Sequence, residues 1–237
     1  MNVVISKDAD ELASRAGADV ATLANEAIRE TGLFTVALSG GSTPLLLYKT
    51  LLDAAVDWER VFFYFGDERN VAADEDASNF KGANKSLFRP LRIREDNILR
   101  WRTELGSPLE VADDYEETLQ KLSADLPKFD LILLGMGADG HTASLFPGTD
   151  ALNERQRLAV ANWVPQLGSW RFTLTYPVIN NARNVMFLVA GKDKAEIVRE
   201  VLEGDEDLPA KLVQPTTGKL AWYLDRASAR DLEHANI

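Results

Sequence analysis

The fold is most strongly constrained by the stretch Phe129-Asp-Leu-Ile-Leu-Leu-Gly-Met-Gly-Ala-Asp-Gly-His-Thr-Ala-Ser-Leu-Phe-Pro-Gly148. It contains an apolar run of strand length, Leu131 to Leu134, followed directly by a glycine-rich loop. An uninterrupted apolar strand is typical of a parallel sheet that is covered on both faces. Because ligands bind beyond the carboxyl ends of such strands, the loop that ends at His141 is predicted to belong to a functional site.

The chemistry of this loop points to proton transfer. Glycines at positions 135, 137 and 140 carry no Cβ, so the loop can press against a ligand while Asp139 and His141 turn inward. An imidazole ordinarily titrates near neutral pH, which suits a general base. His141 is therefore the best catalytic candidate. The alternative is a tight turn in which His141 only satisfies a backbone group.

A second alternative is a dinucleotide-binding loop, because residues 135–140 match the pattern G-x-G-x-x-G. That fingerprint places a helix N-terminus beneath a pyrophosphate. Here Asp139 lies inside the loop, where its charge would repel a pyrophosphate, and Pro147-Gly148 stops any helix within about two turns. The match is weak evidence for a nucleotide site.

The rest of the chain alternates between helical and strand patterns. This alternation predicts an α/β fold with a mostly parallel sheet and helices on both faces, formed by residues 1–237 as a single domain. Pro44 fits the first position of its helix, with Ser42 or Thr43 as the cap. Strands are expected at 33–38, 61–65, 131–134, 158–164, 172–175, 185–190 and 220–224, and helices at 8–31, 45–52, 108–124 and 192–202.

Three short loops directly follow predicted strands, at residues 39–44, 66–69 and 135–141. The carboxyl ends of parallel strands meet at one edge of the sheet, so these loops should line one crevice. The 39–44 loop offers small residues and a helix N-terminus, which are the ingredients of a phosphate cradle, although it also reads as a plain strand-to-helix turn. It is not a Walker loop, because no Gly-Lys-Ser/Thr follows. Cations that could complete an anion site are Arg69, Arg171 and Lys194.

Composition excludes several classes of function. The chain has no cysteine and two histidines, the second being His234 in a polar tail, so a thiol nucleophile or a Cys- or His-based metal site is not expected. A formal charge of −11 argues against nucleic acid or an anionic membrane as partner. There is no apolar run of about 18 residues and no signal-peptide pattern, which predicts a cytoplasmic protein.

Six motifs can now be considered together: Gly40-Gly-Ser-Thr-Pro44, Asp67-Glu-Arg69 with Ser78-Asn79, the 134–148 segment, Arg171-Phe-Thr-Leu-Thr175, Gly191-Lys-Asp-Lys-Ala195 and Leu208-Pro-Ala210. In order and spacing, over nearly the whole chain, they resemble the motifs of the 6-phosphogluconolactonase family. That family usually has prolines and a further basic residue before the Arg-x-Thr-Leu-Thr motif, where this chain has Gly168-Ser-Trp170.

The resemblance implies a three-layer, Rossmann-like α/β fold without a nucleotide. It also implies hydrolysis of 6-phosphoglucono-δ-lactone to 6-phosphogluconate in the pentose phosphate pathway, with no metal or organic cofactor. The expected partner is this small phosphosugar lactone, and the chain is expected to act as a monomer or homodimer.

On this basis, we expect neutral His141 to activate water, with Asp139 orienting the imidazole. Loop N–H groups or Arg69 would stabilise the oxyanion. Asp67 would pair with a basic neighbour or a sugar hydroxyl. The residues expected to bind the substrate, including its phosphate, are Gly40, Gly41, Ser42, Thr43, Asp67, Gly137, Arg171 and Lys194.

Two other functions stay open at this point. The superfamily includes glucosamine-6-phosphate deaminase/isomerase, whose pattern has a glutamate where this chain has Phe146. A catalytically silent sensor of sugar phosphates is the other alternative.

Overall fold

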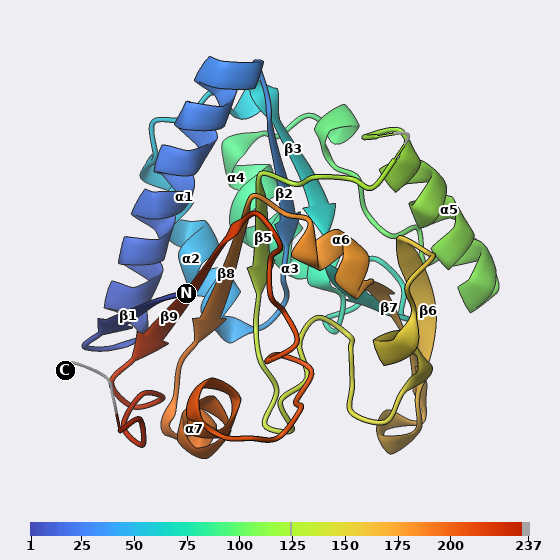
Figure 1. Ribbon diagram of the computed structural model, residues 1–237. Coiled ribbons are helices and arrows are strands. Elements are labelled where there is room, and N and C mark those ends of the chain that lie inside the picture. The colour runs from blue at the N-terminus through green and yellow to red at the C-terminus, as the bar shows by residue number, and fades with distance from the viewer. Residues whose placement is uncertain (124, 234–237) are drawn as a thin grey trace.

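The computed structural model describes residues 1–123 and 125–233 (Figure 1). His234 lies outside the described residues. In the described part, six strands form a parallel sheet in the order β1-β9-β8-β5-β2-β3. These strands are β1 (Asn2–Ser6), β2 (Phe34–Leu38), β3 (Val61–Phe65), β5 (Leu131–Leu134), β8 (Asn184–Val189) and β9 (Lys219–Asp225).

Helices flank this sheet. α1 and α2 contact one another and pack on strands of one face, while α5, α6 and a second, smaller sheet lie beyond the other face (Figure 1). The α-helices are α1 (Ala9–Thr31), α2 (Ser42–Thr50), α3 (Asn79–Ala83), α4 (Arg89–Leu91), α5 (Pro108–Gln120), α6 (Tyr176–Asn180) and α7 (Ala195–Glu203). The predicted α/β class with a mostly parallel sheet is confirmed.

The central strands are apolar because both of their faces are covered. Every residue of β2 and of β5 is buried, as are the last five residues of β8. Phe187 on β8 and Trp222 on the neighbouring strand β9 stack with ring centroids 3.9 Å apart. One hydrophobic core runs from the parallel sheet to the small sheet, where it includes Phe172 and Leu174.

The first helix shows how local signals fix element ends. The Asp8 side chain accepts a hydrogen bond from the Glu11 N–H at 2.9 Å, which satisfies a donor that the helix leaves free. At the other end Gly32 has a φ of 87°, a left-handed conformation that stops the helix. The prediction of a helix over 8–31 is confirmed.

The start of α2 differs from the prediction. The helix begins at Ser42 instead of Pro44, and neither Ser42 nor Thr43 caps it, because the residue at the N-cap is Gly41 with no side-chain hydrogen bond. A φ of 101° at Gly41 turns the chain sharply into the helix. Pro44 is tolerated because the first turn of a helix needs no donor there.

The structure also contains a second, smaller sheet that the sequence did not predict. Residues 158–164 and 172–175 correspond to β6 (Ala159–Val164) and β7 (Ser169–Leu174), which pair with each other antiparallel. β4 (Asp67–Arg69), predicted as a loop, adds antiparallel to β7. An antiparallel pair needs only a short turn, and here that turn contains Gly168 with a φ of 54°. β1 was also missed, because its apolar part is only three residues long, Val3 to Ile5.

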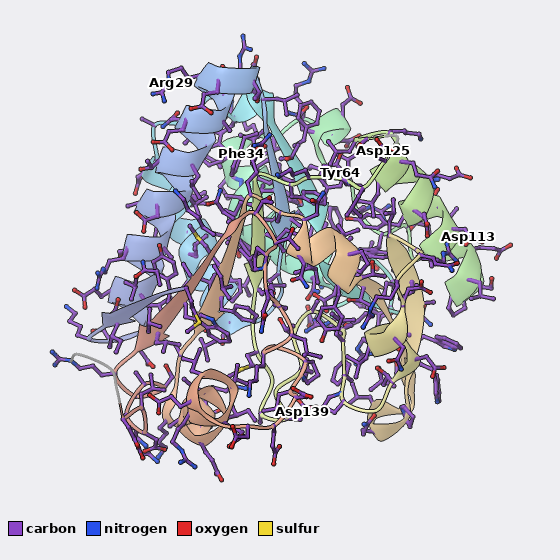
Figure 2. The ribbon with its side chains drawn as sticks, in the orientation of Figure 1. Arg29, Phe34, Tyr64, Asp113, Asp125 and Asp139 are labelled. Atoms are coloured by element: carbon purple, nitrogen blue, oxygen red, sulfur yellow. The ribbon has the colours of Figure 1, made fainter. Side chains whose placement is uncertain are left out.

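The topology fixes the place of the site. From β2 the chain continues to β3 on one side, whereas from β5 it continues through the small sheet to β8 on the other. β2 and β5 are neighbours, so a crevice opens beyond their carboxyl ends, the usual ligand site of such sheets. Figure 2 shows Phe34, which begins β2, near one end of the molecule and Asp139, beyond the end of β5, at the opposite end.

Candidate active site

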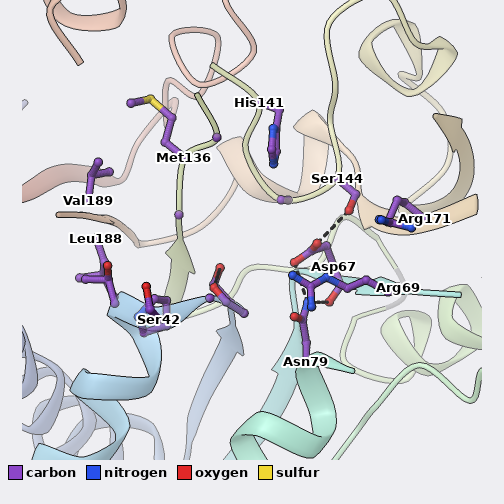
Figure 3. Close-up of a pocket in the computed structure, with 18 of the residues that line it drawn as sticks. Ser42, Asp67, Arg69, Asn79, Met136, His141, Ser144, Arg171, Leu188 and Val189 are labelled. Carbon is purple, nitrogen blue, oxygen red and sulfur yellow. Dashed lines mark hydrogen bonds between the residues drawn. The ribbon is translucent and has the colours of Figure 1, made fainter. Parts of the chain in front are cut away.

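A cleft with a volume of about 770 Å³ lies beyond the carboxyl ends of β2 and β5. The three predicted loops contribute to it, so the expectation that they share one crevice is confirmed. Figure 3 shows His141 on the wall opposite Ser42, with Arg69 and Arg171 to one side. Of the predicted site residues, only Asp139 does not line the cleft. Those that line it are Gly40, Gly41, Ser42, Thr43, Asp67, Arg69, Gly137, His141, Arg171 and Lys194.

Asp139 lies behind His141. Its Oδ1 is 2.5 Å from His141 Nδ1, and the same oxygen accepts a hydrogen bond from the His141 backbone N–H at 3.2 Å. The sequence left open whether these side chains meet, and the structure shows that they do. Partial burial raises the pKa of the Asp139 carboxyl, but the charge and hydrogen bonds of His141 outweigh it, so that pKa lies below its usual value. Asp139 is therefore an ionised acceptor at neutral pH.

Gly137 makes this pair sterically feasible. A Cβ at residue 137 would lie 2.0 Å from His141 Nδ1 and 2.6 Å from Asp139 Oδ1, far inside van der Waals contact. Its N–H also donates to the carbonyl of His141 at 2.9 Å, which closes the loop. A larger residue would therefore displace the imidazole.

Two arginines occupy the wall formed by the small sheet. Arg69 on β4 and Arg171 on β7 are directly opposite each other in the strand register. Arg69 donates to the carbonyl of Ala77, and Arg171 donates to Ser169 Oγ at 2.8 Å. Within residues 1–123 and 125–233, neither forms an ion pair with a carboxylate. Burial, and then the charge of Arg69, lowers the pKa of the Arg171 guanidinium. An anion between them would relieve this repulsion.

Lys194 approaches from the loop after β8. It belongs to a 3₁₀ turn, η7 (Lys192–Lys194), and its side chain is 22 % exposed. Its Nζ is 3.9 Å from Asp193 Oδ2, a loose contact that leaves the ammonium able to bind a ligand. Lys194 lines the cleft, as the sequence predicted. The neighbouring Asp193, which belongs to the same quoted motif but was given no role, also lines it.

The beginning of α2 supplies neutral donors. Gly40, Gly41, Ser42 and Thr43 line the cleft, and the first turn of a helix has backbone N–H groups without partners inside the helix. Such a terminus favours anions. Gly40 lies so close to Asn79 that a Cβ there would be 1.8 Å from Asn79 Oδ1.

Asp67 differs in part from the prediction. Its buried carboxylate accepts hydrogen bonds from Ser144 Oγ at 2.8 Å and from Asn79 Nδ2 at 3.2 Å (Figure 3). These partners are neutral, so the expected ion pair with a basic neighbour is absent from the described structure. Asp67 instead ties the loop of His141 to the start of α3, because Ser144 follows His141 by three positions.

Three further residues of the site belong to the quoted motifs, but the sequence analysis gave them no role in lactone hydrolysis. Asn79 and Ser144 hold Asp67, and Phe146 lies against the imidazole of His141. Ser144 and Phe146 belong to the same conspicuous loop as His141, which was the available signal. Asn79 comes from another element, and the motif that groups it with Asp67 did not show that the two side chains are in contact. Within the residues described, no three side chains of His, Cys, Asp or Glu gather as a metal site would require.

The comparisons with known proteins agree with this architecture. Residues 7–222 match the family described as glucosamine-6-phosphate isomerases/6-phosphogluconolactonase. A 6-phosphogluconolactonase of Synechocystis is 41 % identical, over 98 % of each chain. The structure of 6-phosphogluconolactonase from Trypanosoma brucei is 28 % identical, with a TM-score of 0.88 over 98 % of each chain. A monomeric glucosamine-6-phosphate deaminase, 22 % identical with a TM-score of 0.81 over 98 % of this chain and 100 % of its own, shares the fold.

The chain belongs to the glucosamine-6-phosphate isomerase/6-phosphogluconolactonase family and is an enzyme of that family. No helix among the described residues is both long enough and apolar enough to span a bilayer.

Proposed function

We propose that this enzyme hydrolyses 6-phospho-D-glucono-1,5-lactone to 6-phospho-D-gluconate, as the lactone-hydrolysing step of the oxidative pentose phosphate pathway. The observation that carries the proposal is the contact of His141 with Asp139, in a cleft that also contains two arginines without a carboxylate partner among the described residues. The relatives named 6-phosphogluconolactonase support the choice of substrate.

His141 acts as the general base. An ionised carboxylate can only accept a hydrogen bond, so the Nδ1 that faces Asp139 carries the proton of the neutral ring. The other nitrogen, Nε2, then has a free lone pair and takes a proton from water. As that proton leaves, the water oxygen attacks the lactone carbonyl carbon, and Asp139 stabilises the imidazolium that forms.

The tetrahedral intermediate collapses when the bond from the carbonyl carbon to the ring oxygen breaks. The imidazolium returns its proton to the departing ring oxygen, which becomes a hydroxyl group, and His141 is neutral again. Water has then added across one ester bond. The negative charge on the former carbonyl oxygen is stabilised by Arg69 or by backbone N–H groups of the loops.

The C6 phosphate binds where positive charge and free donors converge. Arg171, Lys194 and the N-terminus of α2 at Ser42 line the cleft and supply them. Charge-assisted hydrogen bonds to a phosphate are stronger than neutral ones, which favours a phosphorylated sugar over a neutral one. The chain as a whole carries a formal charge of −11, so a local cluster of cations indicates a site for an anionic ligand.

The deaminase chemistry of the same family is the alternative. It needs ring opening and proton movement between adjacent carbons, for which the deaminase pattern pairs a glutamate with the histidine. Phe146 stands at that position, is buried and has no group that can transfer a proton. This observation favours lactone hydrolysis.

The decisive variant is His141→Ala. We expect its kcat to fall by roughly 10²-fold or more, the usual scale for a lost general base. The assay uses freshly generated lactone, couples the 6-phosphogluconate formed to its dehydrogenase, and subtracts spontaneous hydrolysis. Thermal unfolding of the variant is the control for its fold. Turnover near that of the wild type in a folded variant would remove His141 from the mechanism.

A further inference from the structure

The aromatic ring of Phe146 lies almost flat against the imidazole of His141. The two ring centroids are 4.0 Å apart and the ring planes differ by 25°. A tight turn between them brings the rings together, since the N–H of Leu145 donates to the carbonyl of Thr142 at 2.9 Å. Ala143 inside this turn has a φ of 47°, a left-handed conformation that is uncommon for alanine. The stack thus depends on a locally strained backbone.

Phe146 is held in place independently of His141. Its carbonyl accepts hydrogen bonds from the N–H of Thr149 at 3.2 Å and from Thr149 Oγ1 at 2.8 Å. Pro147 and Gly148, with a φ of 75° at Gly148, form the middle of the turn that these bonds close. Asn162 on β6 donates to Thr149 Oγ1 at 3.0 Å, which anchors the turn to the small sheet. Phe146 is therefore a fixed wall, 7 % exposed.

The ring of Phe146 fixes the plane of the His141 imidazole, which the other contacts of His141 do not fix. The contact with Asp139 fixes one nitrogen but leaves the ring able to rotate about it, and Gly137 only leaves room beside that nitrogen. A flat neighbour defines the ring plane and hence the direction of Nε2. The face of a benzene ring is also electronegative, so it favours a cationic partner over a neutral one.

The charged groups of the cleft act on the same ring. Asp139 contacts the imidazole directly, while the other charged residues that line the cleft come from β4, β7 and η7: Asp67, Arg69, Arg171, Asp193 and Lys194. Three of these five are cations, which disfavour a further positive charge on His141. Phe146 acts in the same direction as Asp139 and against the cations.

We propose that Phe146 is a positioning residue for the reaction of His141: it aligns Nε2 with the attacking water and stabilises the imidazolium that forms during turnover. This inference rests on the proposed function for its effect on rate. Its effect on the imidazole itself does not depend on which substrate the enzyme uses.

The test compares Phe146→Leu with Phe146→Tyr, which restores an aromatic face. For Phe146→Leu we expect kcat to fall about 3- to 30-fold, the scale of a lost cation–π contact, while KM for the lactone changes less than about twofold. The acid limb of the pH profile should move to lower pH, because the protonated imidazole loses a favourable neighbour. Phe146→Tyr should restore both kcat and the acid limb to near the wild-type values.

An NMR titration of the His141 Cε1–H signal reads the imidazole without any substrate. The chain has two histidines, so the spectrum of His141→Gln assigns the signal. Thr149→Val removes one anchor of Phe146 and leaves both rings intact, and it should shift the titration in the same direction by a smaller amount. This variant decides the matter if Phe146→Leu does not fold.

An unchanged titration in folded Phe146→Leu, or in Thr149→Val if Phe146→Leu is unfolded, would overturn the inference. So would a raised KM with an unchanged kcat, because Phe146 would then be only part of the substrate wall. If the wild type shows no lactonase activity but the titration shifts as expected, the proposed function fails while the role of Phe146 toward the imidazole stands.

Discussion

The contact between His141 and Asp139 in the cleft depends on the absence of a side chain at Gly137. At Gly137, even a methyl group would overlap with the imidazole of His141. The 2.5 Å contact between His141 and Asp139 depends on that space. Proton transfer requires such precise placement, because a base must reach its proton within hydrogen-bond distance. The pH dependence of the reaction should therefore report the state of this pair.

The wild-type kcat/KM should fall at acidic pH as one group protonates. The pKa of Asp139 is already lowered, so its carboxylate stays ionised while the imidazole gains its proton. In Asp139→Asn the charge that favours the imidazolium is lost, so the acid limb should move to lower pH and kcat should decrease. Initial rates from pH 5 to 8 measure both effects. A flat wild-type profile would count against a neutral imidazole as the base.

The proposal that Arg171 binds the C6 phosphate can be tested with a single substitution. Arg171→Ala should lower kcat/KM for the phosphorylated lactone about 10- to 150-fold, since a charge-assisted contact is worth about 1.5–3 kcal/mol. Gluconolactone without the phosphate is the control substrate, measured with the same variant. An equal loss on both substrates would show that Arg171 does not recognise the phosphate.

At the scale of elements, the site joins two sheets. The parallel sheet carries the loops with Ser42, His141 and Lys194, whereas the small antiparallel sheet carries Arg69 and Arg171. The first group was predictable, because loops after parallel strands gather at one edge. The proximity of the two arginines was not, since it arises from the β4–β7 register. A three-residue strand of charged residues such as β4 carries no apolar pattern that could reveal it.

Elements remote from the cleft should affect stability alone. Asp8→Ala removes the side-chain cap of α1, whose N-terminus contributes no residue to the cleft. We expect the free energy of unfolding to fall by about 0.5–2 kcal/mol, as for other lost caps, with kcat unchanged. Urea unfolding and the lactonase assay on one preparation measure both. A changed kcat in the folded variant would mean that the cleft is coupled to this end of α1.

For the whole molecule, the fold narrows the function without deciding it. Short, uninterrupted apolar runs and their spacing predicted the sheet, since a strand covered on both faces must be apolar throughout. A glucosamine-6-phosphate deaminase shares the fold, so in the proposed mechanism the choice between the two chemistries depends on Phe146, Asp139 and His141. Both substrates carry a C6 phosphate, which the same cations could bind. Only the reacting groups distinguish them.

The most direct measurement therefore compares the two reactions on one preparation of the wild-type enzyme. Lactone hydrolysis is followed above its spontaneous rate, and ammonia release is followed with glucosamine-6-phosphate at the same enzyme concentration. We predict lactone hydrolysis well above background and no detectable ammonia, with glucosamine-6-phosphate acting at most as a weak inhibitor, because Phe146 cannot serve as the second proton-transfer group. Ammonia release at a rate comparable to lactone hydrolysis would contradict the lactonase assignment.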